Sequence, residues 1–279
     1  MNTPLLYASL CCPLDGQPLQ QQANSWRCTQ GHSFDTASQG YVNLLPVQKK
    51  RTLDPGDSNE MVGARRRFLA SGVYAPLAQQ LAACIQEANL PPSATCLDAG
   101  CGEGYYLRYC QAHLSSRSLR WVGLDISKWA VLAAAKKNGD MRWLVGSNAN
   151  LPLLPSTVDY ALCMFGFPVY EEFARVLKPE GTLLMVEAGP EHLRELREII
   201  YPELKGKSDQ WQVPDGFVLQ QRQRLQCQVT LNSPELIADL LLMTPHLYRA
   251  SAAGLARAQG LTHLVVSVDV EFRTLRRRP

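Results

Sequence analysis

The sequence predicts an α/β fold with a doubly wound, mostly parallel sheet, preceded by a small N-terminal unit. From about residue 76, short apolar segments alternate with helical patterns of about ten residues, as in a parallel sheet covered by helices. One apolar segment runs directly into a glycine-rich turn, and cysteine and histidine residues before residue 40 are spaced as in two metal-binding turns. These observations divide the chain into 1–39, a connector at 40–75 and a main domain at 76–279.

The N-terminal unit contains two short turns with metal-ligating residues. Cys12 and Cys28 lie sixteen residues apart, and His32 follows Cys28 by four. Zinc prefers four such ligands in a tetrahedron, and a segment this short needs a metal to hold its fold. Asp15 occupies the position where a second thiolate is expected. Either Asp15 binds the metal through oxygen, or the neighbouring Cys11 turns inward, or the ribbon has lost its metal and aromatic packing holds its turns.

The connector carries a turn and two basic clusters. The Asp-Pro-Gly-Asp string at 54–57 predicts a turn, and Asp57 or Ser58 is placed to cap a helix that runs to Phe68. The basic residues are Lys49, Lys50, Arg51, Arg65, Arg66 and Arg67. Such clusters most often lie on solvated faces, but two in one chain are also typical of a surface that follows a phosphate backbone.

The main domain is predicted to alternate strands and helices before it ends in a hairpin. Predicted strands lie at 94–99, 119–125, 141–145, 158–164 and 181–187, and predicted helices at 77–88, 105–113, 128–137 and 171–178. In the tail, 218–231 and 263–273 alternate apolar and polar residues, with a predicted helix at 234–243 between them. Alternation of this kind predicts a half-exposed antiparallel hairpin at the sheet edge.

Composition restricts the class of protein and its location. The chain is 46% hydrophobic and 19% charged with a net charge of +3, which is ordinary globular usage. No apolar run reaches the roughly 18 residues that span a bilayer. Nine cysteines, most of them in apolar contexts, indicate a reducing compartment without a disulfide framework. We therefore expect a cytoplasmic protein with no membrane partner.

The glycine-rich turn is the main candidate binding site. It follows a predicted strand and opens a predicted helix, so its backbone and the helix N-terminus are available to a ligand. Asp98 precedes Gly100 by two residues and is placed to take a ligand's ammonium group. Asp125 ends the next strand, where a carboxylate accepts hydrogen bonds from ribose hydroxyls. A structural turn or one that binds NAD remains the alternative, although the spacing Gly100, Gly102 and Gly104 is tighter than in dinucleotide folds.

This turn resembles motif I of the class I S-adenosylmethionine-dependent methyltransferases. Asp125 matches the ribose-binding acid of that class, and 147–152, which includes Asn148, matches its adenine-side loop. The resemblance implies a Rossmann-like, seven-stranded, mostly parallel sheet with a C-terminal antiparallel hairpin. It also implies that S-adenosyl-L-methionine is the cofactor.

The segment after the fourth predicted strand bears on the methyl acceptor. Enzymes of this class that methylate exocyclic amines often carry an Asn/Asp-Pro-Pro loop there, whereas 164–170 reads Met-Phe-Gly-Phe-Pro-Val-Tyr. Methylation of an adenine or cytosine amine is therefore disfavoured. Phe165, Phe167 and Tyr170 either stack on a base or belong to the core.

A narrower resemblance extends over nearly the whole chain. It rests on the N-terminal turns and on the strings at 31–35, 40–48, 54–58, 64–69, 98–106 and 189–193. These are similar to the bacterial 23S ribosomal RNA guanine-N(1) methyltransferases, which carry an N-terminal zinc-binding module. The Tyr-Val-Asn-Leu-Leu-Pro and Asp-Pro-Gly-Asp-Ser strings are specific to that family. The resemblance implies methylation of ring nitrogen 1 of a guanosine in 23S rRNA, and a homodimer.

The family resemblance also assigns individual residues. Tyr74 and His192 match positions that contact S-adenosylmethionine, as do Gly102 and Glu103 in the glycine-rich turn. The zinc ligands of the family fall on Cys12, Asp15, Cys28 and His32, with Asp15 as the departure from the family pattern. The two basic clusters would then hold RNA phosphates.

The expected reaction is a direct displacement in which the protein aligns the attacking nitrogen, the methyl carbon and the sulfur. Ring nitrogen 1 of guanine carries a proton that must be removed, and no residue is assigned to that role. The nitrogen lies on the Watson–Crick edge, so the base must be unpaired or flipped out. Two alternatives remain at this point: a small-molecule methyltransferase of the same fold, and a non-catalytic RNA-binding or assembly protein.

Overall fold

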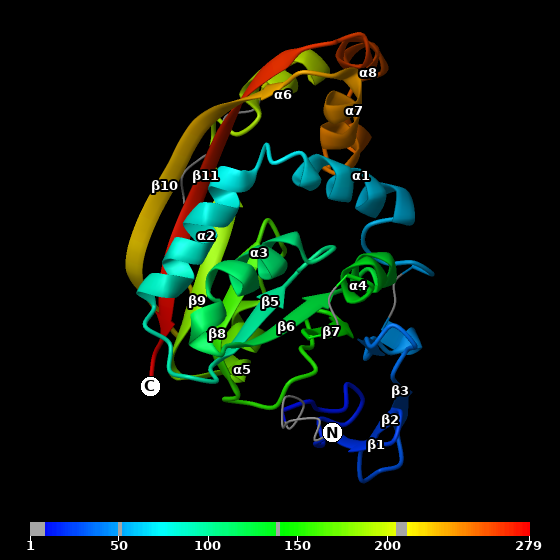
Figure 1. The fold of residues 1–279 in the computed structure, drawn as a ribbon, viewed down its shortest axis with the longest axis vertical. Helices are drawn as coiled ribbons and strands as arrows, with labels where there is room; N and C mark the ends of the chain where they lie inside the picture. The colour runs from blue at the N-terminus through cyan, green and yellow to red at the C-terminus, as the bar shows by residue number, and fades with distance from the viewer. Residues whose placement is uncertain (1–8, 50–51, 138–139, 205–210) are drawn as a thin grey trace.

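The structure is a computed structural model that describes residues 9–49, 52–137, 140–204 and 211–279. Its centre is an eight-stranded sheet with the order β10-β11-β9-β8-β5-β6-β7-β4 (Figure 1). These strands are β4 (Val42–Asn43), β5 (Thr95–Ala99), β6 (Arg120–Asp125), β7 (Arg142–Val145), β8 (Val158–Met164), β9 (Leu177–Ala188), β10 (Phe217–Leu231) and β11 (Leu264–Arg277). The strands from β4 to β9 run parallel, and β10 and β11 form the antiparallel hairpin that the tail predicted.

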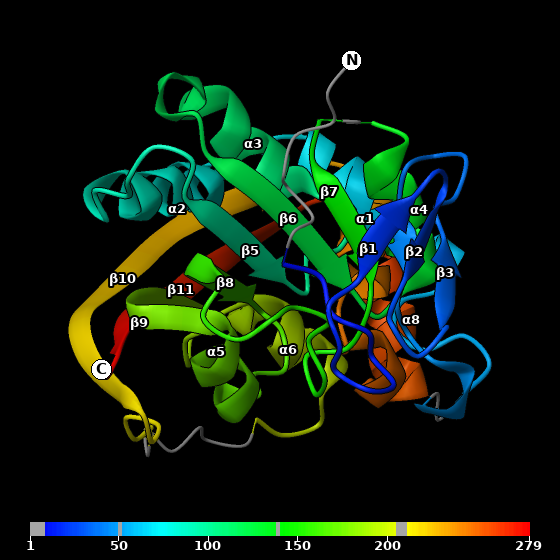
Figure 2. The same cartoon turned by 90° about the horizontal axis from the view of Figure 1, so that it is seen from below.

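Helices cover both faces of this sheet. They are α1 (Asn59–Ala70), α2 (Ala75–Glu87), α3 (Tyr105–His113), α4 (Lys128–Ala135), α5 (Tyr170–Val176), α6 (Arg194–Ile200), α7 (Pro234–Leu242) and α8 (Ala252–Gln259). Figure 2 shows α2 and α3 on one face and α5 on the other. The long strands β10 and β11 extend past the rest of the sheet to α6, α7 and α8, and α1 packs against α4 and α7 (Figure 1).

The class I methyltransferase fold is confirmed, but the sheet has eight strands where seven were predicted. The additional strand, β4, comes from the connector and pairs in parallel with β7 through Val42 and Leu144. Its two residues show no recognisable strand pattern of their own. They form a strand because they pair with the apolar edge strand β7. Helix α8 was also not predicted, and its N-terminus is capped by the Ser251 hydroxyl, which accepts from the Gly254 amide.

The N-terminal unit is a small three-stranded antiparallel sheet of β1 (Gln20–Gln22), β2 (Ser25–Arg27) and β3 (Ser33–Asp35). We call residues 9–39 the ribbon. Its buried Leu10 and Trp26 share one apolar cluster with Leu124 and Leu144 of the large sheet. Because so small a sheet buries little surface alone, this packing stabilises the ribbon against the face of the large sheet that α5 also covers.

The connector contains a regular helix, as the capping residues predicted. Helix α1 begins after Ser58, whose hydroxyl accepts from the Met61 amide at 3.2 Å. In the described part of the chain no single helix is long and apolar enough to cross a membrane, and α1 with α2 reaches that length only as a pair bent by 84°.

Candidate active site

A cavity of about 1250 Å³ lies at the carboxyl ends of the parallel strands. It is bounded on one side by the glycine-rich turn and on the other by β9, β10 and β11, with α1 and the segment after α7 as a further wall. All eight residues predicted to bind the cofactor line it: Tyr74, Asp98, Gly100, Gly102, Glu103, Asp125, Asn148 and His192. Ligands of open α/β sheets bind at this edge, because the strand order changes direction there.

The glycine-rich turn has a backbone that only glycine adopts without strain. Gly100 has φ +108° and Gly104 has φ +78°, and the Gly100 amide donates to the Leu124 carbonyl at 2.8 Å. A Cβ on Gly104 would overlap the ring of Trp143 in the neighbouring strand β7. The glycines therefore serve both the conformation of the turn and its close packing on the sheet.

Asp98 is a buried carboxyl group with one unpaired oxygen. Its side chain lies in β5 and is 2% exposed, and among the described residues its Oδ1 has no hydrogen-bond partner. Burial raises the pKa of Asp98 to about 8, and the nearby charge of Asp125 adds to the effect. A buried carboxylate in this state is complementary to the ammonium group of S-adenosylmethionine, which would supply the missing donor and positive charge.

Asp125 and Asn148 organise the loops around the turn. Asp125 Oδ2 accepts from the Gly102 amide at 2.9 Å, and Oδ1 accepts from the Ser127 amide at 2.8 Å. Asn148 Nδ2 donates to the carbonyls of Ala99 at 3.3 Å and Phe167 at 3.1 Å. The predicted ribose acid and the predicted adenine-side residue thus lie beside the turn, which fits a nucleoside bound across β5 and β6.

Glu103 is paired inside the fold. Its carboxylate, 2% exposed, accepts from Arg108 at 2.7 Å and lies 3.6 Å from Lys137 Nζ. The charge is therefore compensated before any ligand binds. This residue lines the cavity and fixes the start of α3 through Arg108.

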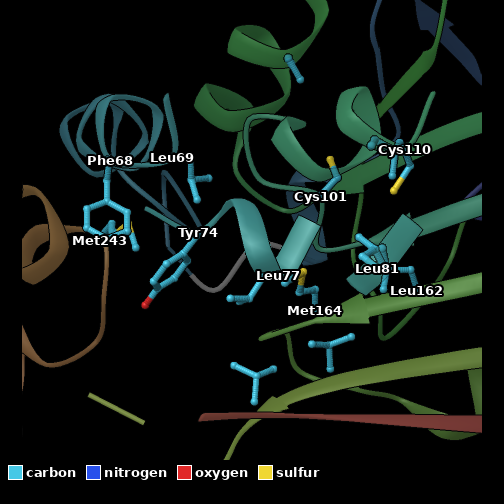
Figure 3. Close-up of a cluster of buried hydrophobic side chains, with 14 of the residues drawn as sticks. Phe68, Leu69, Tyr74, Leu77, Leu81, Cys101, Cys110, Leu162, Met164 and Met243 are labelled. Atoms are coloured by element: carbon cyan, nitrogen blue, oxygen red, sulfur yellow. The ribbon is translucent and has the colours of Figure 1, made fainter. Parts of the chain in front are cut away.

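Tyr74 and His192, which only the family resemblance selected, lie on one wall of the cavity. The Tyr74 ring meets Phe68 edge to face at a centroid distance of 5.0 Å, and Figure 3 shows both beside Met243. The His192 ring stacks on Phe165 at 5.7 Å and lies 6.3 Å from Tyr74. No local pattern marks either residue, because α2, β8 and β11 meet only in the folded chain.

The aromatic residues after β8 differ in their surroundings. Phe165 is 43% exposed at φ +52°, and Phe167 is 91% exposed, and both line the cavity. Tyr170 instead packs against Phe217 of β10 at a centroid distance of 6.3 Å. Of the two readings open at the sequence level, base stacking is compatible with Phe165 and Phe167, and core packing describes Tyr170.

The four predicted metal ligands converge in the ribbon. The ligand atoms of Cys12, Asp15, Cys28 and His32 all lie within 4.8 Å of one another. Asp15 Oδ2 is 3.0 Å from His32 Nδ1 and 3.1 Å from Cys28 Sγ, and both sulfurs are 3.4 Å from His32 Nδ1. Bonds of about 2.0–2.3 Å in a zinc tetrahedron place ligand atoms about 3.3–3.8 Å apart. The separations to His32 from both sulfurs lie in this range and those from Asp15 are a few tenths of an ångström shorter, so this donor set fits zinc with a small outward shift of Asp15.

Asp15 occupies the fourth corner of this group by position. The thiol of Cys11, the other residue considered for it, points to the Leu151 carbonyl at 3.9 Å. The structure therefore favours ligation through the Asp15 carboxylate over an inward-turned Cys11.

The arginines at 65–67 do not form one surface. Arg65 lines the cavity and bonds to Asp57 and, at 3.0 Å, to the Met243 carbonyl. Arg67, although 59% of its side chain is exposed, pairs with the buried Asp239 of α7 at 2.5 Å, and Arg66 is exposed as well. In the preceding cluster Lys49 ends a short 3₁₀ turn, and Lys50 and Arg51 lie outside the described residues.

The sequence analysis missed a charged group on the far wall of the cavity. It contains Glu187 of β9, Arg222 and Arg224 of β10, and Glu271 and Arg273 of β11. We call these five residues the charged wall. The only signal in the sequence is the polar half of the alternating tail, because strand register determines which of these side chains meet.

Comparisons with known proteins bear on the family of this chain. Residues 10–53 match a zinc-ribbon family model described as "RlmA, N-terminal", and residues 96–181 match one described as "Methyltransferase domain". Among solved structures, the YcgJ protein of Bacillus subtilis is 17% identical with a TM-score of 0.46, over 72% of this chain and 99% of that one. The two family models place a zinc-ribbon segment and a methyltransferase domain in this chain.

Two curated relatives indicate to which family of methyltransferases the chain belongs. The Bacillus subtilis protein YxjB, named a 23S rRNA (guanine-N(1)-)-methyltransferase, is 32% identical over 208 residues, covering 73% of this chain and 72% of that protein. The 23S rRNA (guanine(748)-N(1))-methyltransferase of Streptomyces fradiae is 37% identical over 190 residues, covering 67% and 66%. Since YxjB is more than 30% identical to this chain over more than two thirds of both proteins, this chain belongs to the 23S rRNA (guanine-N(1))-methyltransferase family.

Proposed function

We propose that this protein transfers a methyl group from S-adenosylmethionine to ring nitrogen 1 of a guanosine in 23S rRNA. The proposal rests on the shape of the cavity in this chain, which belongs to the family. One continuous cavity joins the glycine-rich turn to an open end with the exposed Phe165 and Phe167 and the charged wall. The first end suits a nucleoside cofactor, and the second suits a single base.

The sulfonium of the cofactor supplies an activated methyl group, so the protein acts mainly by alignment. In this proposal Asp98 holds the ammonium end, Asp125 accepts from the ribose hydroxyls, and Asn148 fixes the loop beside the adenine. The hydrogen bonds of Asp125 and Asn148 to the backbone hold these two side chains in place before the ligand binds. Little reorganisation is then needed during the reaction.

The target base must leave its helix, because ring nitrogen 1 lies on the pairing edge. Phe167 is the most exposed of the aromatic side chains that line the cavity, and Phe165 stacks on His192. Aromatic side chains of this kind stack on splayed bases in single-stranded RNA. We assign Phe165 and Phe167 to the flipped guanine.

The ribbon and the basic residues of the connector complete the proposal. Cys12, Asp15, Cys28 and His32 would hold one zinc ion that stabilises the two turns. Arg66 and the 49–51 cluster would contact RNA phosphates, while Arg65 and Arg67 serve the fold. The family resemblance supports a homodimer in the cytoplasm, and light scattering on the purified protein tests the dimer.

The direct test is primer extension on unmodified 23S rRNA after incubation with the protein and S-adenosylmethionine. A methyl group on ring nitrogen 1 blocks pairing, so we expect one new reverse-transcription stop. Guanosine 748, which the name of the Streptomyces fradiae relative specifies, is the first position to inspect. Methyl transfer to RNA without a stop would place the methyl off the pairing edge, and cofactor binding with no transfer would point to a small-molecule acceptor.

A further inference from the structure

The charged wall is ordered by the register of three adjacent strands. Glu187 and Glu271 lie directly opposite each other in β9 and β11, and Arg273 lies opposite Arg222 in β10. Two carboxylates in this arrangement repel each other unless a cation separates them. Arg273 supplies that cation, because its guanidinium pairs with both Glu187 and Glu271.

Along the carboxyl edge of the sheet, Glu187 lies beyond the part of the cavity that suits the cofactor. The strands at the carboxyl edge come in the order β6, β5, β8, β9, with Asp125, Asp98 and Glu187 on the first, second and fourth. Adjacent strands are about 4.8 Å apart, so Glu187 lies roughly 10 Å along this edge from β5. A cofactor with its ribose at β6 and its amino-acid part at β5 leaves β8 and β9 for the methyl acceptor.

The other possible proton acceptors on this side of the cavity, Glu271 and His192, are already hydrogen-bonded to partners. Glu271 pairs through Oε1 with Arg222 and through Oε2 with Arg273. His192 Nδ1 accepts from the Asp269 amide at 3.3 Å, so the ring proton is on Nε2, which then cannot accept one. Glu187 uses only Oε2, in its bond to Arg273. Within the described residues, its Oε1 has no hydrogen-bond partner.

The acids at the other end are also unsuited to the acceptor. Asp125 accepts two backbone amides, and Glu103 pairs with Arg108. Asp57 bonds to Arg65, and its carbonyl oxygen accepts from Ser127 beside β6. Asp98 lies at the ammonium end. Glu187 therefore combines a place beside the base with an uncommitted oxygen.

We propose that Glu187 is the catalytic base of the methyl transfer, an inference that rests on the proposed function. Glu187 Oε1 first accepts the proton of guanine ring nitrogen 1, and the electron pair left on that nitrogen then forms the bond to the methyl carbon. The carbon–sulfur bond breaks, its electron pair stays on sulfur, and S-adenosylhomocysteine leaves as a neutral thioether. The proton then passes from Glu187 to solvent, so one proton is released for each methyl transferred.

The same carboxylate selects guanine. Ring nitrogen 1 and the exocyclic amine of guanine are both donors on one edge. Glu187 Oε1 accepts from the ring nitrogen, and Oε2, which has a second lone pair beside its bond to Arg273, accepts from the amine. Adenine presents an acceptor at ring nitrogen 1 and is repelled. Arg273 is the positioning residue for this carboxylate: its side chain is only 7% exposed, and Trp211 stacks on the guanidinium at 4.4 Å.

The test is the Glu187→Gln variant, which keeps the size and removes the proton acceptor. We expect kcat to fall by about 10²- to 10⁴-fold, with the Kd for S-adenosylmethionine within about twofold of wild type because the amino-acid and ribose sites are untouched. Residual activity should rise about tenfold per pH unit in the alkaline range, where solvent must remove the proton. Wild-type kcat should be level there.

Two further variants separate chemistry from folding. Glu180→Gln is the matched control. Glu180 lies in the same strand, outside the cavity lining, and its carboxylate is 3.1 Å from the guanidinium of Arg276. The kcat of this variant should equal that of wild type. Glu187→Asp keeps a carboxylate on a shorter stem and should show intermediate kcat with the wild-type pH profile. A Glu187→Gln enzyme within threefold of wild-type kcat, or with an unchanged pH profile, would overturn the assignment. Absence of the stop with wild-type enzyme would instead refute the proposed function.

Discussion

At the scale of single residues, Asp98 is a binding-site residue that lowers the stability of the ligand-free protein. Its carboxylate is buried with one oxygen unpaired, a state that a cationic ligand relieves. We expect Asp98→Asn to raise the Kd for S-adenosylmethionine by about 10- to 100-fold, since a charged hydrogen bond contributes roughly 1.5–3 kcal/mol. Isothermal titration calorimetry measures this, and an unchanged Kd would show that the ammonium binds elsewhere.

The pKa of Asp98 gives a second residue-scale prediction. Burial raises this pKa to about 8, above its ordinary 3.8. Between these values the folded protein holds a proton that the unfolded chain has lost, so this group's contribution to stability falls as pH rises. We expect the Tm of Asp98→Asn relative to wild type to increase from pH 5 to pH 8. A Tm difference that is constant with pH would contradict the prediction.

At the scale of elements, the join of β5 to α3 depends on Gly104, and Gly40 of the connector is a comparison glycine with a different constraint. Gly104 has φ +78° and would place a Cβ against Trp143, whereas Gly40 in the connector has φ +88° and open space around it. We expect Gly40→Ala to cost about 1–2 kcal/mol from its backbone alone. Gly104→Ala should cost about 1–3 kcal/mol more from the overlap. Urea unfolding compares the two, and equal losses would show that the ring moves aside without cost.

Helix α1 offers a second comparison between neighbouring residues. Arg67 pairs with the buried Asp239 of α7, and Arg66 is exposed. We expect Arg67→Ala to lower the free energy of unfolding by about 1–3 kcal/mol, because it leaves Asp239 without its cation. Arg66→Ala should leave stability within about 0.5 kcal/mol and reduce the salt slope of RNA binding by about 1. Filter binding at several salt concentrations and urea unfolding of both variants provide the readouts.

At the scale of the whole molecule, the ribbon is hydrogen-bonded to the cofactor side of the main domain. The Cys11 amide donates to the Pro152 carbonyl at 3.1 Å, and Asn150 Nδ2 donates to the Pro13 carbonyl at 3.1 Å. These bonds connect the first metal-binding turn to the loop that holds Asn148. We therefore expect a change in the metal site to alter the cofactor site through these hydrogen bonds.

Metal analysis tests this connection. We expect about one zinc ion per chain, lost in a Cys12→Ser/Cys28→Ser variant, with a weaker affinity for S-adenosylmethionine because the 147–152 loop loses its support. Cys227→Ser, which changes a half-buried thiol in β10 far from the ribbon in sequence, is the control. Loss of zinc with an unchanged Kd would mean that the loop keeps its position without the metal.

Much of the fold follows from local pattern. The bounds of α3 and β8 agree with their prediction, and the alternating tail forms the β10–β11 hairpin. Each of these has a strong apolar period or a marked boundary, which local sequence carries. Strand β4 and helix α8 were missed because neither has such a pattern.

The candidate site divides in the same way. By itself the sequence determined the glycine-rich turn with Asp98 and Asp125, because the chain must bend there and close approach requires glycine. Only the tertiary structure decided that Arg65 and Arg67 are bound within the fold, that Asp15 joins the metal ligands, and that Glu187 meets Arg273. The reason is that these contacts join residues distant in sequence through strand register and helix packing, which no local period encodes.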